Sequence, residues 1–377
     1  MKQNESILAR TLRGEKTERV PVAPFIHVNY VDEFFQQAGS DPITKSIEVY
    51  DHFGFDIILR NCTINFLDET ACDSKQWRVT NEKQILEPGQ SWQVITTIRT
   101  PERELRQIKK FSQVSPFEAV EAISEYYIKE PEDFDQFLKY QPPVPTYDGT
   151  NIRRAKEYLA GRGLVAPWGQ GAFNMTSMYR KLDDLLIDPY VQKDFYEAMM
   201  GYFIKRELEV FRQYAAFGAD MVCCGGNVAN GNVVGPEYFS EYILPFEAKL
   251  ARDVRDMGLY HVYHNCGDAK KLLPLYSGIG MNMYESLTPP PYGDTDLETA
   301  LNVFNPDIIL SGNIDQIHLL RYGSNEEIEE AVRKTLELAK KRGRFILATT
   351  DYFNENTPAD KVAVFAEAAA RYGRYDN

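Results

Sequence analysis

The sequence lacks any apolar run approaching the ~20 residues that a membrane-spanning helix requires. It also lacks a run of lysine and arginine long enough to follow a phosphate backbone. Its 55 acidic residues outweigh 42 basic ones and leave a formal net charge of −13. No apolar signal region follows the first residues, Met1-Lys2-Gln3-Asn4-Glu5. We therefore expect a cytoplasmic protein whose partners include neither nucleic acid nor a membrane.

Cysteine is scarce, with five residues spread through the chain, an odd number that does not suggest a disulfide framework. They are Cys62, Cys72, Cys223, Cys224 and Cys266. We expect reduced thiols, each of which is a buried apolar residue, a nucleophile or a metal ligand. The glycine pairs Gly225-Gly226 and Gly278-Ile279-Gly280 do not make a dinucleotide fingerprint, because neither has the G-x-G-x-x-G spacing between a strand and a helix.

A composition of 44% hydrophobic and 26% charged residues is that of a globular protein with a large core. Eight short apolar runs alternate with helical periods, which is the pattern of repeated βα units around a parallel sheet. These runs are Val20–Ile26, Phe55–Arg60, Leu164–Pro167, Asp220–Cys224, Leu259–Cys266, Met281–Leu287, Ile308–Gly312 and Phe345–Thr350. They favour an α/β protein, a closed (β/α)8 TIM barrel, with an open doubly wound sheet as the alternative.

Two segments interrupt this rhythm. Residues 75–112 contain two strand-like runs separated by Pro88-Gly89, which predicts an inserted antiparallel β-hairpin. Residues 113–160 are polar and proline-rich, and we expect them to form a helical lid or cap. We therefore expect residues 1–377 to form a single TIM-barrel domain that carries both elaborations.

The sharpest chemical feature is the stretch His264-Asn265-Cys266-Gly267 at the end of the fifth expected strand. Residues two apart on a strand face the same side, so the His264 imidazole and the Cys266 thiol should point together where the strand ends. In a barrel, that end is where active sites are built. An imidazole and a thiolate suit zinc, although a lone His-x-Cys can also be ordinary packing.

Zinc needs further ligands, and two carboxylates follow neighbouring strands. Glu285 lies at the end of the sixth strand, and Asp351 comes directly after the eighth. A carboxylate at a strand end is also a common helix N-cap, which is the alternative reading of Asp351. The candidate zinc ligands are therefore His264, Cys266, Glu285 and Asp351, and the first three are the candidate catalytic residues.

Four other residues at strand ends are candidates for binding a substrate. They are His27, Asn227, Asn313 and Tyr352. The imidazole and amide groups can donate and accept hydrogen bonds, and the tyrosine ring can wall the pocket. Packing or loop geometry would explain the same residues without a ligand.

Several of these motifs occur together in one known family. Val20-Pro21, Gly218-Ala219-Asp220, His264-Asn265-Cys266-Gly267, Gly312-Asn313-Ile314-Asp315 and Thr357-Pro358 stand in the family's order and spacing. In them the chain resembles the uroporphyrinogen decarboxylase superfamily, and within it the corrinoid-dependent methyltransferases. The resemblance implies a barrel and a zinc site built from His-x-Cys plus a distant cysteine. Thr350-Asp351-Tyr352 stands where that cysteine would fall, and Glu285 stands where the similar cobalamin-independent methionine synthases have a glutamate ligand.

The resemblance implies Zn2+ as cofactor and a corrinoid (cobalamin) protein as partner in one-carbon metabolism. A carboxylate in place of a thiolate makes zinc more electrophilic, which favours transfer of an O-, N- or S-methyl group from a small substrate to the corrinoid. The reverse reaction, methylcobamide:thiol methyl transfer, stays open, as does a non-catalytic sensor. A metal-free decarboxylase is the further alternative, but the segment after Val20-Pro21 lacks the arginines that substrate carboxylates need.

Overall fold

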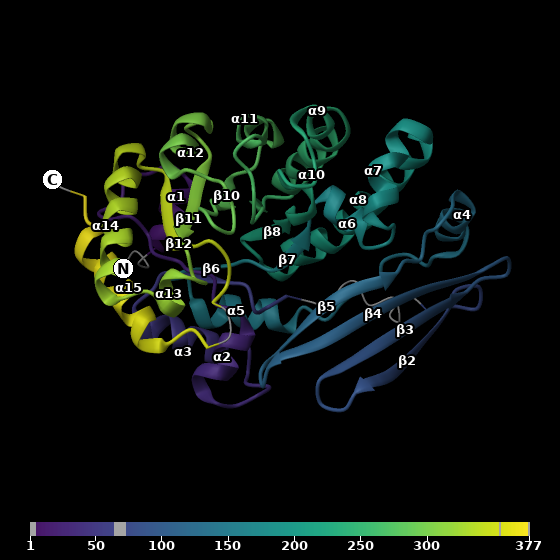
Figure 1. Ribbon diagram of the computed structural model, residues 1–377, viewed down its shortest axis with the longest axis horizontal. Coiled ribbons are helices and arrows are strands. Elements are labelled where there is room, and N and C mark those ends of the chain that lie inside the picture. Colours follow the sequence, from purple (N-terminus) through teal and green to yellow (C-terminus); the bar gives the residue numbers. More distant parts are fainter. Residues whose placement is uncertain (1–4, 64–72, 354–355, 376–377) are drawn as a thin grey trace.

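The computed structural model describes residues 5–63, 73–353 and 356–375, and six of its strands form one continuous parallel sheet (Figure 1). In spatial order they are β12 (Phe345–Thr349), β11 (Ile309–Ile314), β10 (Met283–Ser286), β9 (Tyr260–His264), β8 (Met221–Gly225) and β7 (Trp168–Gln170). A second parallel pair joins β1 (Ile57–Leu59) to β6 (Gly163–Val165). All eight expected strand positions thus carry extended chain. Residues 20–26 supply the first strand, and β6 and β7 together form the third.

Hydrogen bonds close these strands into a ring. Val22 forms a parallel bridge with Leu347 of β12, and its carbonyl accepts the Asp56 N–H at 2.8 Å just before β1. On the other side, the Asp220 N–H before β8 donates to the Val165 carbonyl of β6 at 2.9 Å. The circuit confirms the (β/α)8 TIM barrel, and the open doubly wound sheet is wrong.

Helices follow the strands and cover the outside of the barrel (Figure 1). In chain order they are α1 (Ile7–Leu12), α2 (Val28–Phe35), α3 (Thr44–Phe53), α4 (Pro131–Tyr140), α5 (Thr150–Leu159), α6 (Ala172–Ser177), α7 (Leu182–Val191), α8 (Lys193–Phe217), α9 (Pro236–Tyr238), α10 (Leu244–Asp256), α11 (Leu273–Tyr276), α12 (Leu297–Val303), α13 (Leu319–Tyr322), α14 (Asn325–Arg342) and α15 (Ala359–Tyr372). In the part of the chain that is described, none of these helices is both long and apolar enough to cross a bilayer.

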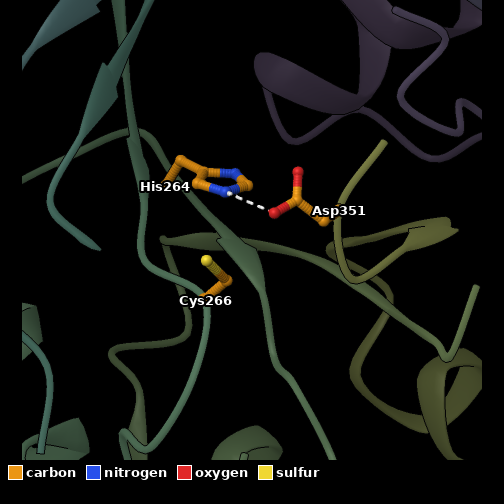
Figure 2. Close-up of side chains that lie close together, drawn as sticks. All are labelled: His264, Cys266 and Asp351. Atoms are coloured by element: carbon orange, nitrogen blue, oxygen red, sulfur yellow. Dashed lines mark ion pairs between the residues drawn. The ribbon is translucent and has the colours of Figure 1, made fainter. Parts of the chain in front are cut away.

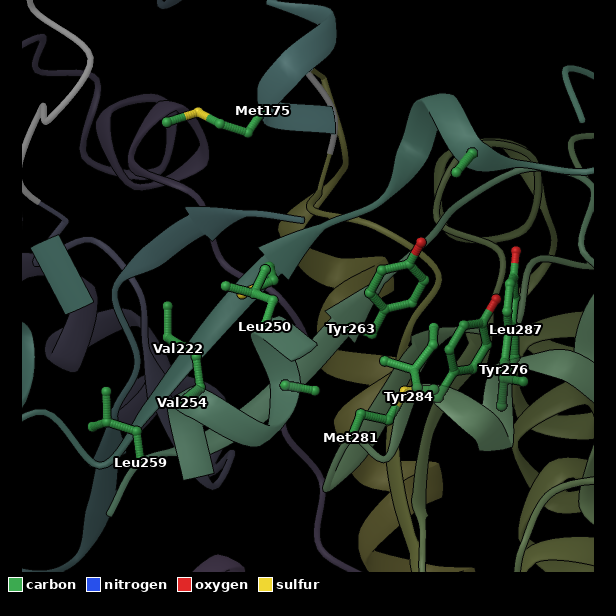
Figure 3. Packing of buried hydrophobic residues seen from close by; sticks show 14 of the residues in the cluster. Met175, Val222, Leu250, Val254, Leu259, Tyr263, Tyr276, Met281, Tyr284 and Leu287 are labelled. Atoms are coloured by element: carbon green, nitrogen blue, oxygen red, sulfur yellow. The ribbon is translucent and has the colours of Figure 1, made fainter. Parts of the chain in front are cut away.

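Alternation along the strands divides the apolar residues into two layers. Inward-facing side chains, among them Ile58, Met221, Val262 and Met283, fill the barrel, and Leu8 of α1 packs against them. Outward-facing side chains pack against the helices. Figure 3 shows part of this outer layer, in which Val222 and Tyr263 share one buried cluster with Leu250 and Val254 of α10.

The insertion differs from the expected hairpin, because it is a four-stranded antiparallel sheet in the order β2-β3-β4-β5 (lower right in Figure 1). Its strands are β2 (Arg78–Glu87), β3 (Ser91–Arg99), β4 (Glu104–Ser115) and β5 (Glu118–Glu125). The expected helical cap at 113–160 is therefore wrong for residues 113–115 and 118–125, which continue the strands on either side of a turn at Pro116-Phe117. Helices α4 and α5 supply the helical part, and α5 packs beside β6 as a barrel helix.

The base of the inserted sheet is anchored in the protein core. Trp77, Ile98 and Leu105 are almost fully buried there, and the Trp77 ring lies 5.0 Å from that of Phe137 in α4. Most other side chains on β2 and β5 are exposed. The sheet is therefore held at one end and presents much of its surface to solvent.

Candidate metal centre

His264 and Cys266 stand at the carboxyl end of β9, where the chain leaves the barrel (Figure 2). His264 follows the inward-facing Val262 by two residues and is 2% exposed. Between the two, Asn265 turns away and its amide donates to the carbonyl of Gly226 at 3.1 Å. Gly267, with φ +96, then turns the chain back. The expected convergence of the imidazole and the thiol is found.

Asp351 completes a group of three potential metal ligands with His264 and Cys266, which we call the metal group (Figure 2). One ligand atom from each lies within 4.8 Å of the others, and His264 Nε2 is 3.8 Å from Asp351 Oδ2. Tetrahedral zinc holds such atoms about 3.5 Å apart, so the group needs to contract by only about 1 Å. Nitrogen, sulfur and oxygen donors at the barrel mouth therefore fit a zinc ion with room for an exogenous ligand.

The loop after β12 fixes Asp351 in this position. Its Oδ1 accepts the Tyr352 N–H at 2.8 Å, and its own N–H donates to Gln316 Oε1 at 3.3 Å. Gln316 is 2% exposed and also accepts the Thr350 hydroxyl at 2.7 Å. These contacts hold the carboxylate toward His264 and not at a helix N-terminus, which was its alternative reading.

Glu285 lies beside this group but is engaged elsewhere, which differs from its expected place among the ligands. Its two carboxylate oxygens accept Arg60 Nη1 at 2.9 Å and Nη2 at 2.5 Å, and both side chains are 1–2% exposed. The Arg60 guanidinium lies over the rings of Phe25 and Trp168, at 4.6 and 5.2 Å. A buried arginine needs a compensating charge, and Glu285 supplies it.

Glu285 acts on His264 through the nitrogen that faces away from Asp351. His264 Nδ1 lies 3.6 Å from Glu285 Oε2 and 3.4 Å from the Ser286 hydroxyl. A histidine ligand commonly donates its second N–H to a carboxylate, which fixes the tautomer and the ring plane. The geometry therefore leaves Nε2 facing Asp351 and available to a metal ion, and it makes Glu285 a residue that orients the imidazole ring.

The charges of the group shift its pKa values strongly. Burial alone would lower the pKa of His264, but the contacts with Asp351, Cys266 and Glu285 outweigh it and raise this pKa well above its usual range. Burial would raise the pKa of Glu285, but the Arg60 charge and then His264 lower it to about 2. In the same way, His264 overcomes the burial of Asp351 and lowers the pKa of that carboxyl. The imidazole therefore holds a proton beside the Asp351 carboxylate, and a metal ion bound at Nε2 would displace that proton.

Two of the four expected substrate-binding residues wall the mouth. The rings of His27 and Tyr352 lie 5.2 Å apart, and Tyr352 follows Asp351 directly. His27 is the N-cap of α2, where its Nδ1 accepts the Asn29 N–H at 3.4 Å. Burial lowers the pKa of His27 despite the opposing charge of Asp351, so it presents a neutral imidazole beside the metal group.

The other two expected substrate-binding residues form hydrogen bonds within the protein, one with the backbone and one with a helix. Asn227 Oδ1 accepts the Cys266 N–H at 3.3 Å, so it holds the loop that carries Cys266. The Asn313 side-chain oxygen instead accepts the hydroxyl of Thr335 in α14 at 3.2 Å. Asn313 therefore lies outside the metal group, although the alternation of side chains along the strand predicted that it would face the barrel mouth. Gly312, with φ +148, breaks that alternation just before it.

Three site residues escaped sequence reasoning. Arg60 stands 225 positions from its partner Glu285, and no local pattern links them. The Trp168 ring lies 5.4 Å from that of His264, nearly perpendicular to it. Glu118, at the start of β5, accepts the Tyr352 hydroxyl at 2.7 Å, which ties the inserted sheet to the mouth. Arg60 ends the second expected strand and Trp168 directly follows the third, and this strand-end position could have indicated that both lie at the mouth.

Among the described residues, the other cysteines are not part of this group of potential metal ligands. Cys62, Cys223 and Cys224 are buried free thiols, and Cys72 lies outside the described residues. Cys223 faces the barrel interior and Cys224 faces the helices, as adjacent strand residues should. Burial raises the pKa of Cys223 to about 11, which leaves a neutral thiol.

Comparisons with known proteins agree with this architecture. The family model for uroporphyrinogen decarboxylase (URO-D) matches residues 121–372, more than half of the chain. A methyltransferase structure from Methanosarcina mazei superimposes with a TM-score of 0.71 at 15% identity and 97% coverage of both chains, which shows a shared fold.

Two curated proteins of Methanosarcina mazei are similar to this chain in sequence. The methylcobamide:CoM methyltransferase MtbA is 24% identical over 254 residues, which are 67% of this chain and 71% of the relative. A methylated-thiol–coenzyme M methyltransferase is 24% identical over 165 residues, 43% of this chain. That match spans about two fifths of the length of the relative, 41%. On the family match and the shared barrel, this chain belongs to the uroporphyrinogen decarboxylase (URO-D) family.

Proposed function

We propose that this protein is a zinc-dependent methyltransferase that moves a methyl group between a small methylated substrate and a corrinoid protein. The observation that carries the proposal is the convergence of His264, Cys266 and Asp351 at the carboxyl end of the barrel. The curated relatives support the reaction class, since their names describe methyl transfer involving methylcobamide, coenzyme M and methylated thiols.

The three side chains would hold the metal through His264 Nε2, Cys266 Sγ and a carboxylate oxygen of Asp351. Zinc bound there supplies a Lewis acid that improves the heteroatom carrying the methyl group as a leaving group. The thiolate and the carboxylate together carry two negative charges, which match the charge of the ion. An oxygen donor in this set favours an ether or amine methyl donor over a thiol acceptor.

The surrounding residues of this chain orient the group and exclude water. Glu285 fixes the His264 ring through Nδ1, and Arg60 keeps that carboxylate ionised in a buried setting. The rings of Trp168 and Tyr352 wall the mouth, which suits a small substrate with apolar methyl groups. A reacting methyl group held between them would be exposed toward the open side of the mouth, where we place the corrinoid protein.

The metal-free decarboxylase is disfavoured by the state of the arginine at the mouth. Decarboxylation of a polycarboxylate needs cationic groups that are free to bind substrate carboxylates. Both terminal nitrogens of Arg60 already donate to Glu285. The arginine that the fold brings to the site is thus neutralised within the protein.

Methyl transfer to cob(I)alamin tests the proposal directly. Zinc-loaded protein is offered aryl methyl ethers, methylamines and methylated thiols, and methylcobalamin formation is followed by its absorbance. We expect at least one class to react, His264→Ala to abolish the reaction and His52→Ala, on the exposed face of α3, to retain it. If no methyl donor reacts, either with free cob(I)alamin or with a corrinoid protein, the result would favour a ligand-binding sensor. Equal activity of the two variants would contradict the proposed site.

A further inference from the structure

A cavity lies at the opposite end of the barrel from the metal group. It has a volume of about 400 Å3, is partly open to solvent, and lies between residues 11–17, at and after the end of α1, and residues 340–344, where α14 gives way to β12. Strand β12 begins beside this cavity at Phe345 and ends near Asp351. The cavity therefore opens at the amino end of the strands, and the two sites are separated by the barrel core.

The charge of this cavity is opposite to that of the protein. Lys16, Lys340, Arg342 and Arg344 line it, and Glu15 is the acidic residue among its lining side chains. Glu15 is held by arginines outside the lining, with Arg13 Nε at 2.6 Å from its carboxylate. A chain with a formal net charge of −13 thus gathers four cationic side chains around one hollow.

These four cations have little carboxylate compensation within the described part of the protein. Within residues 5–63, 73–353 and 356–375, Lys16, Lys340 and Arg342 have no ion pair, and Arg344 has one long contact of 3.5 Å to the largely exposed Asp307. Arg342 donates its terminal nitrogens to carbonyls, including Leu301 O at 2.6 Å, and its Nε is buried without a hydrogen-bond partner. An anion would neutralise charges that the protein leaves uncompensated.

The wall of the cavity leaves room for one guanidinium close to the backbone of Gly14. A Cβ on Gly14, which has φ +74, would lie 2.2 Å from Arg344 Nη2, so only glycine allows the arginine to lie against this backbone. The Arg344 Nη1 also donates to the Asp307 carbonyl at 2.9 Å. Basic residues in the last turn of α14 would complement the helix dipole in any case. That effect explains neither the cavity nor the approach of Lys16 and Arg344 from other segments.

We propose that this cavity, lined by Lys16, Lys340, Arg342 and Arg344, is a binding site for a small anion that carries phosphate groups. Planar guanidinium and flexible ammonium groups together are the usual means of binding phosphate oxygens. The volume suits a small metabolite and not a macromolecule. The site is independent of the metal group, so its existence does not rest on the proposed methyl transfer.

Calorimetric titration with inorganic pyrophosphate at constant ionic strength tests the site. We expect one pyrophosphate per chain, and we expect Lys340→Gln to weaken binding about tenfold or more through loss of a charge-assisted contact. Lys341→Gln is the matched control, because it removes the same charge from the adjacent, exposed position that does not line the cavity. Lys16→Gln, at an exposed position on another segment, should weaken binding as Lys340→Gln does.

Two further titrations decide where and what the protein binds. His264→Ala should bind pyrophosphate as tightly as the unaltered protein, and loss of binding there would place the anion on the metal and overturn the proposal. Citrate should bind at least tenfold more weakly, and equal affinity would overturn the assignment to phosphate. Absence of saturable pyrophosphate binding, or equal weakening by Lys340→Gln and Lys341→Gln, would overturn the site itself.

Discussion

Replacing Arg60 by methionine isolates the buried ion pair behind the metal group. The two Arg60–Glu285 contacts, at 2.9 and 2.5 Å, join side chains that are 1–2% exposed. Arg60→Met leaves the Glu285 carboxylate buried without its counter-charge, and such a loss costs about 3–5 kcal/mol. The stem of methionine keeps most of the packing against Phe25 and Trp168, so the cost reports on charge and not on a cavity.

The assay is a double-mutant cycle on metal-free protein, with the free energy of unfolding measured by urea denaturation. We expect Arg60→Met/Glu285→Gln to regain much of the stability lost in Arg60→Met, because the neutral amide no longer needs a cation. The expected coupling energy is therefore at least about 2 kcal/mol. A loss below about 1 kcal/mol in Arg60→Met, or additive effects in the double variant, would refute the account of Glu285 as the partner of Arg60.

Three further predictions follow from the structure. Tyr352→Phe should lower the free energy of unfolding by about 1–3 kcal/mol, since Glu118 then loses its buried donor, while zinc content stays unchanged because the Tyr352 N–H still holds Asp351. Asp351→Ala should reduce zinc affinity at least tenfold, measured by competition with a chelator, and Asp351→Cys should retain tight binding. Burial raises the pKa of Glu207 to about 8, so the folded state keeps a proton that the unfolded chain releases above about pH 4.5. The free energy of unfolding should therefore decrease as the pH rises from about 5 to about 8. Glu207→Gln should reduce the slope of this decrease by up to about 1.4 kcal/mol per pH unit.

Much of this fold follows from patterns that are local in the sequence. Apolar runs bounded by helix signals mark all eight strands, and the period of two along β9 brings His264 and Cys266 to one face. Because parallel strands end at one rim of the barrel, the approach of Asp351 was also predictable. These inferences need only the alternation of side chains and the direction of the strands.

What the sequence hid depends on partners that are distant along the chain. Glu285 stands at a strand end, as a ligand would, but Arg60 from the second strand competes for its carboxylate. Asn313 turns outward because Gly312 departs from strand geometry, and no propensity rule specifies that departure. The added strands β4 and β5 have mixed polar faces on a largely exposed sheet, so they lack the buried alternation that identifies a strand.

The central claim is that His264, Cys266 and Asp351 together bind one zinc ion, and metal analysis of purified protein tests it most directly. We predict close to one zinc per chain in the unaltered protein and in His52→Ala, and a large loss in His264→Ala and in Cys266→Ala. Cobalt substitution should add the thiolate charge-transfer absorption of a Cys266–metal bond. Unaltered protein without zinc after growth in zinc-replete medium, or full zinc content in both variants, would contradict the account.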